Sequence, residues 1–368
     1  MPDAEVSKKR FYGIDLLKAL SMLMIVTLHV LGNGGVLGML EPLTVRYEAA
    51  YFLEAMCFCA VNCFGLATGY IMCRTRFSSH RLGALWLEVV WHTFGLTLLF
   101  YLFMPGSAGP WQFFTSFFPV TFSYYWYFTA YFGMFFFIPF FNRLIDTLGK
   151  RTLRRLVFCF VFLFTIMPTS ARSDIFRTGD GYTMAWLTAL YFIGAYLRLY
   201  KPAVKLKTFT YFLLYVMMVL LTWMSKLGFQ ILRPGSEGMI FFKYTSPTIL
   251  LAAVFLLMAF EGLEHRWVKK AAEFFGPTAF GVYIIHCHPL VWFNLLQNRF
   301  VFLAHLPFAP MVFGILASAG VVFFVCSMAD RVRFEIFKKL GIARRCKAVF
   351  ELLGRFGTNL ENAMDNWI

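Results

Sequence analysis

The amino-acid sequence predicts an all-α integral membrane protein with about ten transmembrane helices, and three observations support this fold class. Of its 368 residues, 60% are hydrophobic and only 14% are charged, whereas soluble domains carry about 25% charged residues. The mean hydropathy is +0.66. Ten apolar segments are each long enough to cross about 30 Å of hydrocarbon as a helix, and lipid is the solvent in which so much apolar surface is stable.

The predicted spans divide the chain into three parts. The spans themselves occupy residues 12–35, 48–72, 82–104, 124–145, 153–170, 182–200, 208–227, 241–261, 277–298 and 308–330. The first apolar run is too long for a signal peptide, so we expect it to remain as the first span. Residues 1–10 are then a short N-terminus, residues 11–330 form the membrane domain, and residues 331–368 form a tail.

The placement of Lys and Arg residues predicts the orientation in the membrane. The N-terminus, the loops after the even-numbered spans and the C-terminus together hold 26 of the 34, and the opposite loops hold seven. Because cytoplasmic segments carry the excess of positive charge, we expect both termini in the cytoplasm. Basic and apolar residues alternate in the tail, which predicts an amphipathic helix that binds anionic membrane lipids. The net charge of +15 therefore reflects membrane anchoring, and we expect no nucleic-acid partner.

Ionisable side chains inside spans are costly in lipid, so they mark candidate functional positions. Asp15 and His29 are 14 residues apart, which places them on one face of the first span. Glu88 and His92 have the i,i+4 spacing at which two side chains can touch. His286 falls near the middle of the ninth span. A histidine can serve as a general base at neutral pH; the alternative for each is a neutral side chain that hydrogen-bonds to a neighbouring helix.

Arginines gather at the predicted cytoplasmic end of the second span. Arg74 and Arg76 flank a threonine there, and Arg10 precedes the first span on the same side. Guanidinium groups bind phosphates in a bidentate manner, although ordinary membrane anchoring is the alternative for these three. The eight cysteines fall mostly in apolar runs, and no Cys/His spacing resembles a zinc site. We therefore expect no metal.

Four segments, in this order, resemble the acyltransferase-3 family of polytopic membrane acyltransferases. They are Arg10-Phe-Tyr-Gly-Ile-Asp15 through His29, Phe64-Gly-Leu-Ala-Thr-Gly69 through Arg74-Thr-Arg76, Tyr125-Trp126-Tyr127-Phe128 through Pro139, and Phe275-Gly-Pro-Thr-Ala-Phe-Gly281-Val-Tyr283-Ile-Ile-His286. The resemblance covers roughly residues 11–330. The chain lacks the glutamate that many family members carry after the tryptophan, and we expect no appended esterase-like domain. It therefore resembles the simpler branch of the family.

The resemblance implies an enzyme that transfers an acyl group, commonly acetyl, from cytoplasmic acyl-CoA to a hydroxyl of a cell-surface carbohydrate or lipid-linked glycan precursor. His29 would be the general base, and Asp15 would orient polar groups on the same helix face. The residues implied to bind CoA phosphates are Arg10, Arg74 and Arg76. The residues implied to line the pore or acceptor site are Tyr283, His286, Trp126, Glu88 and His92. The family also implies a bacterial inner (plasma) membrane.

A transporter or flippase of a lipid-linked saccharide is the rival interpretation, since polar groups near the bilayer midplane suit it as well. A simple flippase needs neither the cytoplasmic arginine pair nor the deep His29, and no inverted repeat is visible. One geometric question remains for the acyltransferase. His29 lies far from Arg74 and Arg76 along the membrane normal, so direct transfer requires the thioester arm of CoA to reach deep between the helices.

Overall fold

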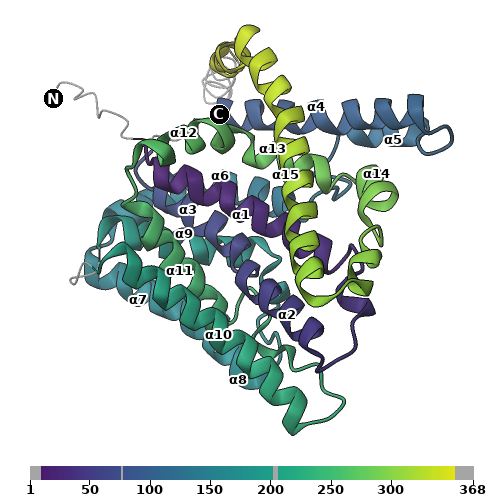
Figure 1. Ribbon diagram of the computed structural model, residues 1–368. Coiled ribbons are helices and arrows are strands. Elements are labelled where there is room, and N and C mark those ends of the chain that lie inside the picture. The colour runs from purple at the N-terminus through teal and green to yellow at the C-terminus, as the bar shows by residue number, and fades with distance from the viewer. Residues whose placement is uncertain (1–9, 76–77, 202–205, 353–368) are drawn as a thin grey trace.

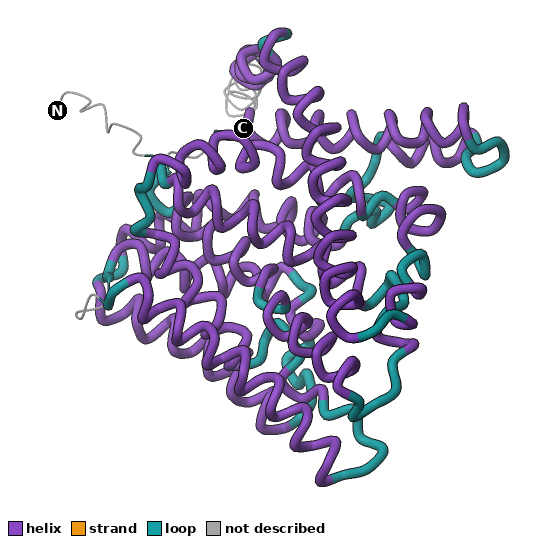
Figure 2. Tube along the Cα trace, in the orientation of Figure 1, coloured by secondary structure: helices purple, strands orange, loops and turns teal. Residues whose placement is uncertain are grey.

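The computed structural model describes residues 10–75, 78–201 and 206–352, and within them the chain forms helices and loops without any β-strand (Figure 2). The prediction of an all-α protein is therefore confirmed. The α-helices are α1 Tyr12–Leu31, α2 Val45–Cys57, α3 Ala60–Met72, α4 His80–Phe103, α5 Pro110–Ser116, α6 Trp126–Thr147, α7 Lys150–Val161, α8 Met167–Ala171, α9 Met184–Leu199, α10 Thr208–Leu232, α11 Pro247–Glu261, α12 Arg266–Phe275, α13 Ala279–His286, α14 Pro289–Val291 and α15 Phe308–Lys339.

Seven helical segments of the described chain are long and apolar enough to cross a membrane. They are α1, α2 with α3, α4, α6, α7 with α8, α10 and α15. An eighth is added if α11 and the segment α12–α13, which are bent by 118° relative to each other, count as one span. The shorter α9 is apolar over 16 residues. All ten predicted segments contain helix and the polytopic architecture is confirmed, while the count of ten and the cytoplasmic ends stay predictions.

The predicted ninth span, 277–298, is wrong as a continuous helix. Helix α13 ends at His286, and Pro289 follows shortly after it. Proline has no backbone N–H and its ring clashes with the preceding helical turn, which favours a break in the helix here. The side chain of His288 instead accepts a hydrogen bond from the backbone N–H of Leu290 (3.2 Å) and caps the short helix α14.

The irregular backbone after this break is held by the loop that follows α1. The N–H of Asn298 donates to the carbonyl of Asn33 (2.9 Å), and the N–H of Phe300 donates to the carbonyl of Gly34 (3.0 Å). Non-helical backbone is tolerated at membrane depth where protein groups satisfy it. The two segments that carry His29 and His286 are thereby tied together.

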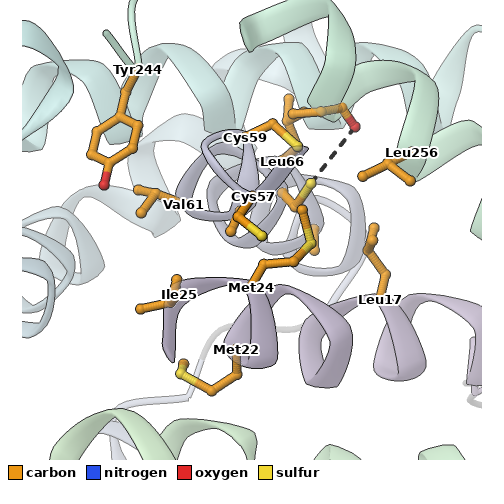
Figure 3. Close-up of a cluster of buried hydrophobic side chains, with 14 of the residues drawn as sticks. Leu17, Met22, Met24, Ile25, Cys57, Cys59, Val61, Leu66, Tyr244 and Leu256 are labelled. Carbon is orange, nitrogen blue, oxygen red and sulfur yellow. Dashed lines mark hydrogen bonds between the residues drawn. The ribbon is translucent and has the colours of Figure 1, made fainter. Parts of the chain in front are cut away.

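Helix α1 lies at the centre of the bundle and packs against α2, α3, α11, α12, α13 and α15 (Figure 1). Figure 3 shows Leu17, Met24 and Ile25 of α1 on the side of that helix that faces Val61 and Leu66 of α3 and Leu256 of α11, within the buried core. By contrast, α4 and α5 extend away from the other helices (Figure 1). Their apolar side chains are exposed, as expected for a surface that faces lipid.

Helices α3 and α9 approach each other closely because glycines line their contact. A β-carbon added at Gly194 of α9 would overlap the carbonyl oxygen of Leu66, and one added at Gly69 of α3 would overlap the carbonyl oxygen of Tyr191. Small residues allow such backbone approach between membrane helices, where dispersion contacts supply much of the association energy.

Asn62 connects three elements inside this region. Its amide nitrogen donates to the carbonyl of Tyr244 in the loop before α11 (2.7 Å), and its amide oxygen accepts from the indole N–H of Trp186 in α9 (2.9 Å). Asn62 and Trp186 are both fully buried. The amide therefore fixes the position of the loop that carries Tyr244.

Replacing Asn62 with alanine is expected to lower the thermal unfolding temperature, because the Trp186 N–H and the Tyr244 carbonyl both lose their partner. Each buried polar group left unpaired costs about 1–3 kcal/mol. Thermal unfolding of the purified protein in nanodiscs measures the effect. Thr188→Ala is the control, because that hydroxyl bonds only to its own helix (Met184 carbonyl, 2.9 Å). Equal unfolding temperatures for the two variants would contradict the role given to Asn62.

Candidate active site

Two histidines from opposite ends of the sequence meet inside the bundle. His29 lies in the last turn of α1, and His286 is the last residue of α13. Their Nδ1 and Nε2 atoms, respectively, are 2.9 Å apart, which is hydrogen-bond distance. The ring of Trp292 meets the His29 ring edge-on, with centroids 4.8 Å apart. The break after α13 thus places His286 beside the end of α1 that carries His29.

The hydrogen bonds determine which ring nitrogens carry protons. His286 Nδ1 lies 2.6 Å from the carbonyl oxygen of Val282, and a carbonyl can only accept, so this nitrogen must be protonated. In neutral His286 the Nε2 atom is then an acceptor, and His29 Nδ1 must donate to it. A neutral His29 consequently carries its lone pair on Nε2. This assignment follows from the hydrogen-bond network.

A cavity of about 190 Å³ lies against His29. Its wall combines aromatic rings with a few polar side chains, which is typical of a small-molecule site. The aromatic residues with polar tips in the wall are Trp126, Tyr127, Tyr182, Tyr244 and Tyr283, and the other polar residues are His29, Asn33 and Glu54. The structure thus places Trp126 and Tyr283 in one wall with His29, as the sequence suggested, and adds Tyr182, Tyr244 and Glu54.

Cys287 is a member of the histidine cluster that the sequence gave no reason to select. Its Sγ atom lies 3.3 Å from His286 Nε2 and 3.8 Å from His29 Nδ1. The ligand atoms of the three residues lie within 4.8 Å of one another, so they could hold a metal ion. Nitrogen and sulfur donors of this kind suit zinc. A bound ion would replace the hydrogen bond between the two histidines, and the expectation of no metal stays a prediction.

Asp15 lies at the other end of α1 and does not reach the histidine pair. Fourteen residues of helix separate it from His29, which corresponds to about 21 Å along the axis. Its carboxylate accepts from Arg10 Nε (2.8 Å) and lies 3.8 Å from Lys18 Nζ. The two residues therefore share a helix face, as predicted, but belong to different sites.

Two of the arginines predicted to bind phosphates, Arg10 and Arg74, lie at the same end as Asp15. Arg74 follows α3 and pairs with Asp146 (3.4 Å), and both side chains are more than half exposed. Arg76 lies outside the described residues. Phe11 follows Arg10 in the sequence, and Tyr70 lies one helical turn before Arg74. The ring centroids of Phe11 and Tyr70 are 5.8 Å apart. This contact shows that Arg10 and Arg74 belong to one end of the bundle.

Arg198 is a further cation at this end, which the sequence did not single out. Its guanidinium lies 4.2 Å from the ring centroid of Phe11 and 5.2 Å from that of Tyr70. It is the basic residue of the last turn of α9, a position that favours cations. The end of the bundle remote from His29 therefore has a cluster of positive charge.

Glu88 and His92 are not in the cavity wall, and they do not pair with each other. His92 Nε2 lies 2.7 Å from Asp330 Oδ1, and Glu88 accepts from Arg333 Nη2 (2.9 Å). Arg333 also forms two hydrogen bonds with Asp330. The reason is that α15 continues to Lys339, beyond the predicted span end at 330. The extra turns bring Arg333 to α4, where it binds Glu88 in place of the predicted neighbour.

Comparison with known families identifies the chain. Residues 11–329 match the family model of the acyltransferase-3 type, described as an acyltransferase domain. Comparisons with curated proteins and with solved structures give no match. The matched residues make up most of the chain and run from the residue before α1 into α15, so they include both histidines and the cavity. The chain therefore belongs to the acyltransferase-3 family and is a multi-pass membrane acyltransferase.

Proposed function

We propose that the protein transfers an acyl group, acetyl foremost, from cytoplasmic acyl-CoA to a hydroxyl of a cell-surface carbohydrate or lipid-linked glycan precursor in a bacterial inner membrane. The observation that carries this proposal is the histidine pair. Its hydrogen bonds leave a lone pair on His29 Nε2, and His29 lines a cavity of polar and aromatic residues. That is the state a general base needs before it accepts a proton.

In the proposed reaction His29 Nε2 takes the proton of the acceptor hydroxyl while the hydroxyl oxygen attacks the thioester carbonyl carbon. A carbon–oxygen bond forms and gives a tetrahedral intermediate. The carbon–sulfur bond then breaks, and the CoA thiolate receives the proton from His29. The products are the acyl ester and free CoA. His286 keeps the His29 ring in the tautomer and orientation that this proton transfer requires, as the orienting member of a catalytic triad does.

The donor is proposed to bind with its phosphates at the opposite end of the bundle, where Arg10, Arg74 and Arg76 belong. The ion pair between Arg74 and Asp146 is exposed, and exposed pairs are weak, so a phosphate can replace the carboxylate at little cost. From Asp15 at this end to His29 the distance along α1 is about 21 Å. The pantetheine arm has to extend along α1 to bring the thioester to His29.

Replacing His29 with alanine is expected to lower the rate of acyl transfer by about 10²–10⁴-fold, because the general base is lost. The measurement is transfer of radiolabelled acetyl from acetyl-CoA to isolated cell-envelope glycan and lipid, with thermal unfolding as a test of the fold. His305→Ala is the matched control, because His305 is exposed and is not among the residues that line the cavity. Full activity of a folded His29→Ala protein would remove His29 from the mechanism.

The double variant Arg74→Ala/Arg76→Ala is expected to weaken acetyl-CoA binding about tenfold or more, since charge-assisted hydrogen bonds to phosphate are lost. Equilibrium binding to the protein in nanodiscs measures this. Arg154→Ala/Arg155→Ala removes the same charge from exposed positions of α7 and serves as the control. Unchanged affinity in the first variant would refute the phosphate assignment, and a folded wild-type protein that binds no acyl-CoA would refute the donor.

A further inference from the structure

We propose that the cavity beside His29 is a subsite for one pyranose ring of the acceptor. In this arrangement the rings of Trp126, Tyr182 and Tyr244 contact an apolar face of the sugar, and Glu54 hydrogen-bonds to its hydroxyl groups. The inference rests on the proposed function and adds to it the site that one acceptor ring occupies and the residues that recognise that ring.

Three aromatic rings from separate segments meet on one side of the cavity. Trp126 begins α6, Tyr182 precedes α9, and Tyr244 precedes α11. The ring centroids of Trp126 and Tyr182 are 4.5 Å apart, those of Tyr182 and Tyr244 are 4.9 Å apart, and the planes of Trp126 and Tyr244 are within 18° of parallel. A pyranose presents C–H groups on its faces, and the negative faces of aromatic rings attract such hydrogens.

Glu54 supplies an acceptor that has no protein partner. Its Oε2 atom is buried and makes no hydrogen bond within the described residues, although Glu54 lines the same cavity as His29. The hydrogen bond of the Lys226 ammonium is to Glu48 (3.1 Å), and none from it reaches Glu54 Oε2. A buried carboxylate oxygen without a donor is costly. Sugar hydroxyls are donors that can approach it from the cavity.

The size of the cavity favours a single ring. Its volume is about 190 Å³, below the roughly 300–1,000 Å³ of sites for drug-sized ligands. An oligosaccharide does not fit within it, and a simple acyl chain would leave Glu54 and Asn33 without partners. The faces of a sugar ring can pack against the aromatic side chains of the cavity. The hydroxyl groups at the edge of the ring can then reach the polar side chains, and one of these hydroxyl groups can face His29.

The aromatic side of the cavity is held in place before any ligand binds. Asp180 and Lys243, which neighbour Tyr182 and Tyr244, form an ion pair (3.0 Å) between the two loops. Gly181 has φ of +108°, and a β-carbon there would overlap the side chain of Tyr244, so only glycine allows this approach. Preorganised walls reduce the entropy lost on binding, which suits a site that recognises a defined shape.

The test is equilibrium binding of octyl glycosides of glucose, galactose and N-acetylglucosamine to the full-length protein in nanodiscs, with empty nanodiscs as background. The comparison ligand is 1-O-octylglycerol, which has the same tail and free hydroxyls but no pyranose ring. At least one glycoside is expected to bind about tenfold more tightly than octylglycerol. Trp126→Ala and Glu54→Ala are each expected to weaken that binding about tenfold or more.

The controls are Trp111→Ala and Glu41→Ala, two exposed positions outside the cavity, which should bind the glycoside like the wild type. If Glu54→Ala does not fold, Glu54→Gln preserves the side-chain shape while it removes the negative charge and one of the two oxygens, and so tests the carboxylate. Equal binding of glycosides and octylglycerol, or unchanged glycoside binding in both cavity variants, would overturn the proposal. Acetyl-CoA binding is measured on the same samples. Its absence beside intact glycoside binding refutes acetyl-CoA as the donor and leaves the pyranose subsite standing.

Discussion

Polar side chains that enter the bilayer must find partners inside the bundle, because lipid offers no hydrogen bonds. This constraint explains much of the interior. Arg333 and Asp330 join α15 to α4, Asn62 joins α3 to α9 and to the loop before α11, and His29 meets His286 where α13 ends. Glu54 in the cavity wall is an exception, because its Oε2 atom is buried and makes no hydrogen bond within the described residues. Other buried polar atoms of the described residues, such as Ser21 Oγ and Ser327 Oγ, also lack a hydrogen bond, but of these residues Glu54 lines the cavity, where a ligand can bind.

The helical, polytopic architecture follows from composition and from the lengths of apolar runs, so the sequence was sufficient for it. The sequence also selected His29, because a histidine deep in a span is costly. It did not reveal that His286 would be the partner, since helix crossings depend on packing across the whole bundle. Residue spacing was misleading in one place. Glu88 was expected beside its helical neighbour, but Arg333 reaches it because α15 runs nine residues past the predicted end.

Binding of the CoA phosphates and transfer of the acyl group are proposed for opposite ends of α1. The basic end has Arg10 and Arg74, and the other end has the histidine pair and the cavity, with about 21 Å of helix between Asp15 and His29. Periodicity placed Asp15 and His29 on one face but could not show that they serve different sites. The aromatic wall was only partly predictable, because Tyr182 and Tyr244 come from loops whose path depends on Asn62 and on the ion pair between Asp180 and Lys243.

The chain of hydrogen bonds behind His29 ends on a backbone carbonyl, that of Val282, and not on a carboxylate. The resting pair is therefore neutral, which avoids burying an ion in the hydrocarbon region. Because no carboxylate lies at the end of this hydrogen-bond chain, the positively charged form of His29 that arises during the reaction is expected to have a short lifetime. An imidazolium formed at His29 has only neutral dipoles behind it, so the proposed proton transfer onward to sulfur must closely follow the attack of the hydroxyl oxygen. The site is thus arranged for a short-lived charge that is created when the hydroxyl attacks and removed when the thiolate leaves.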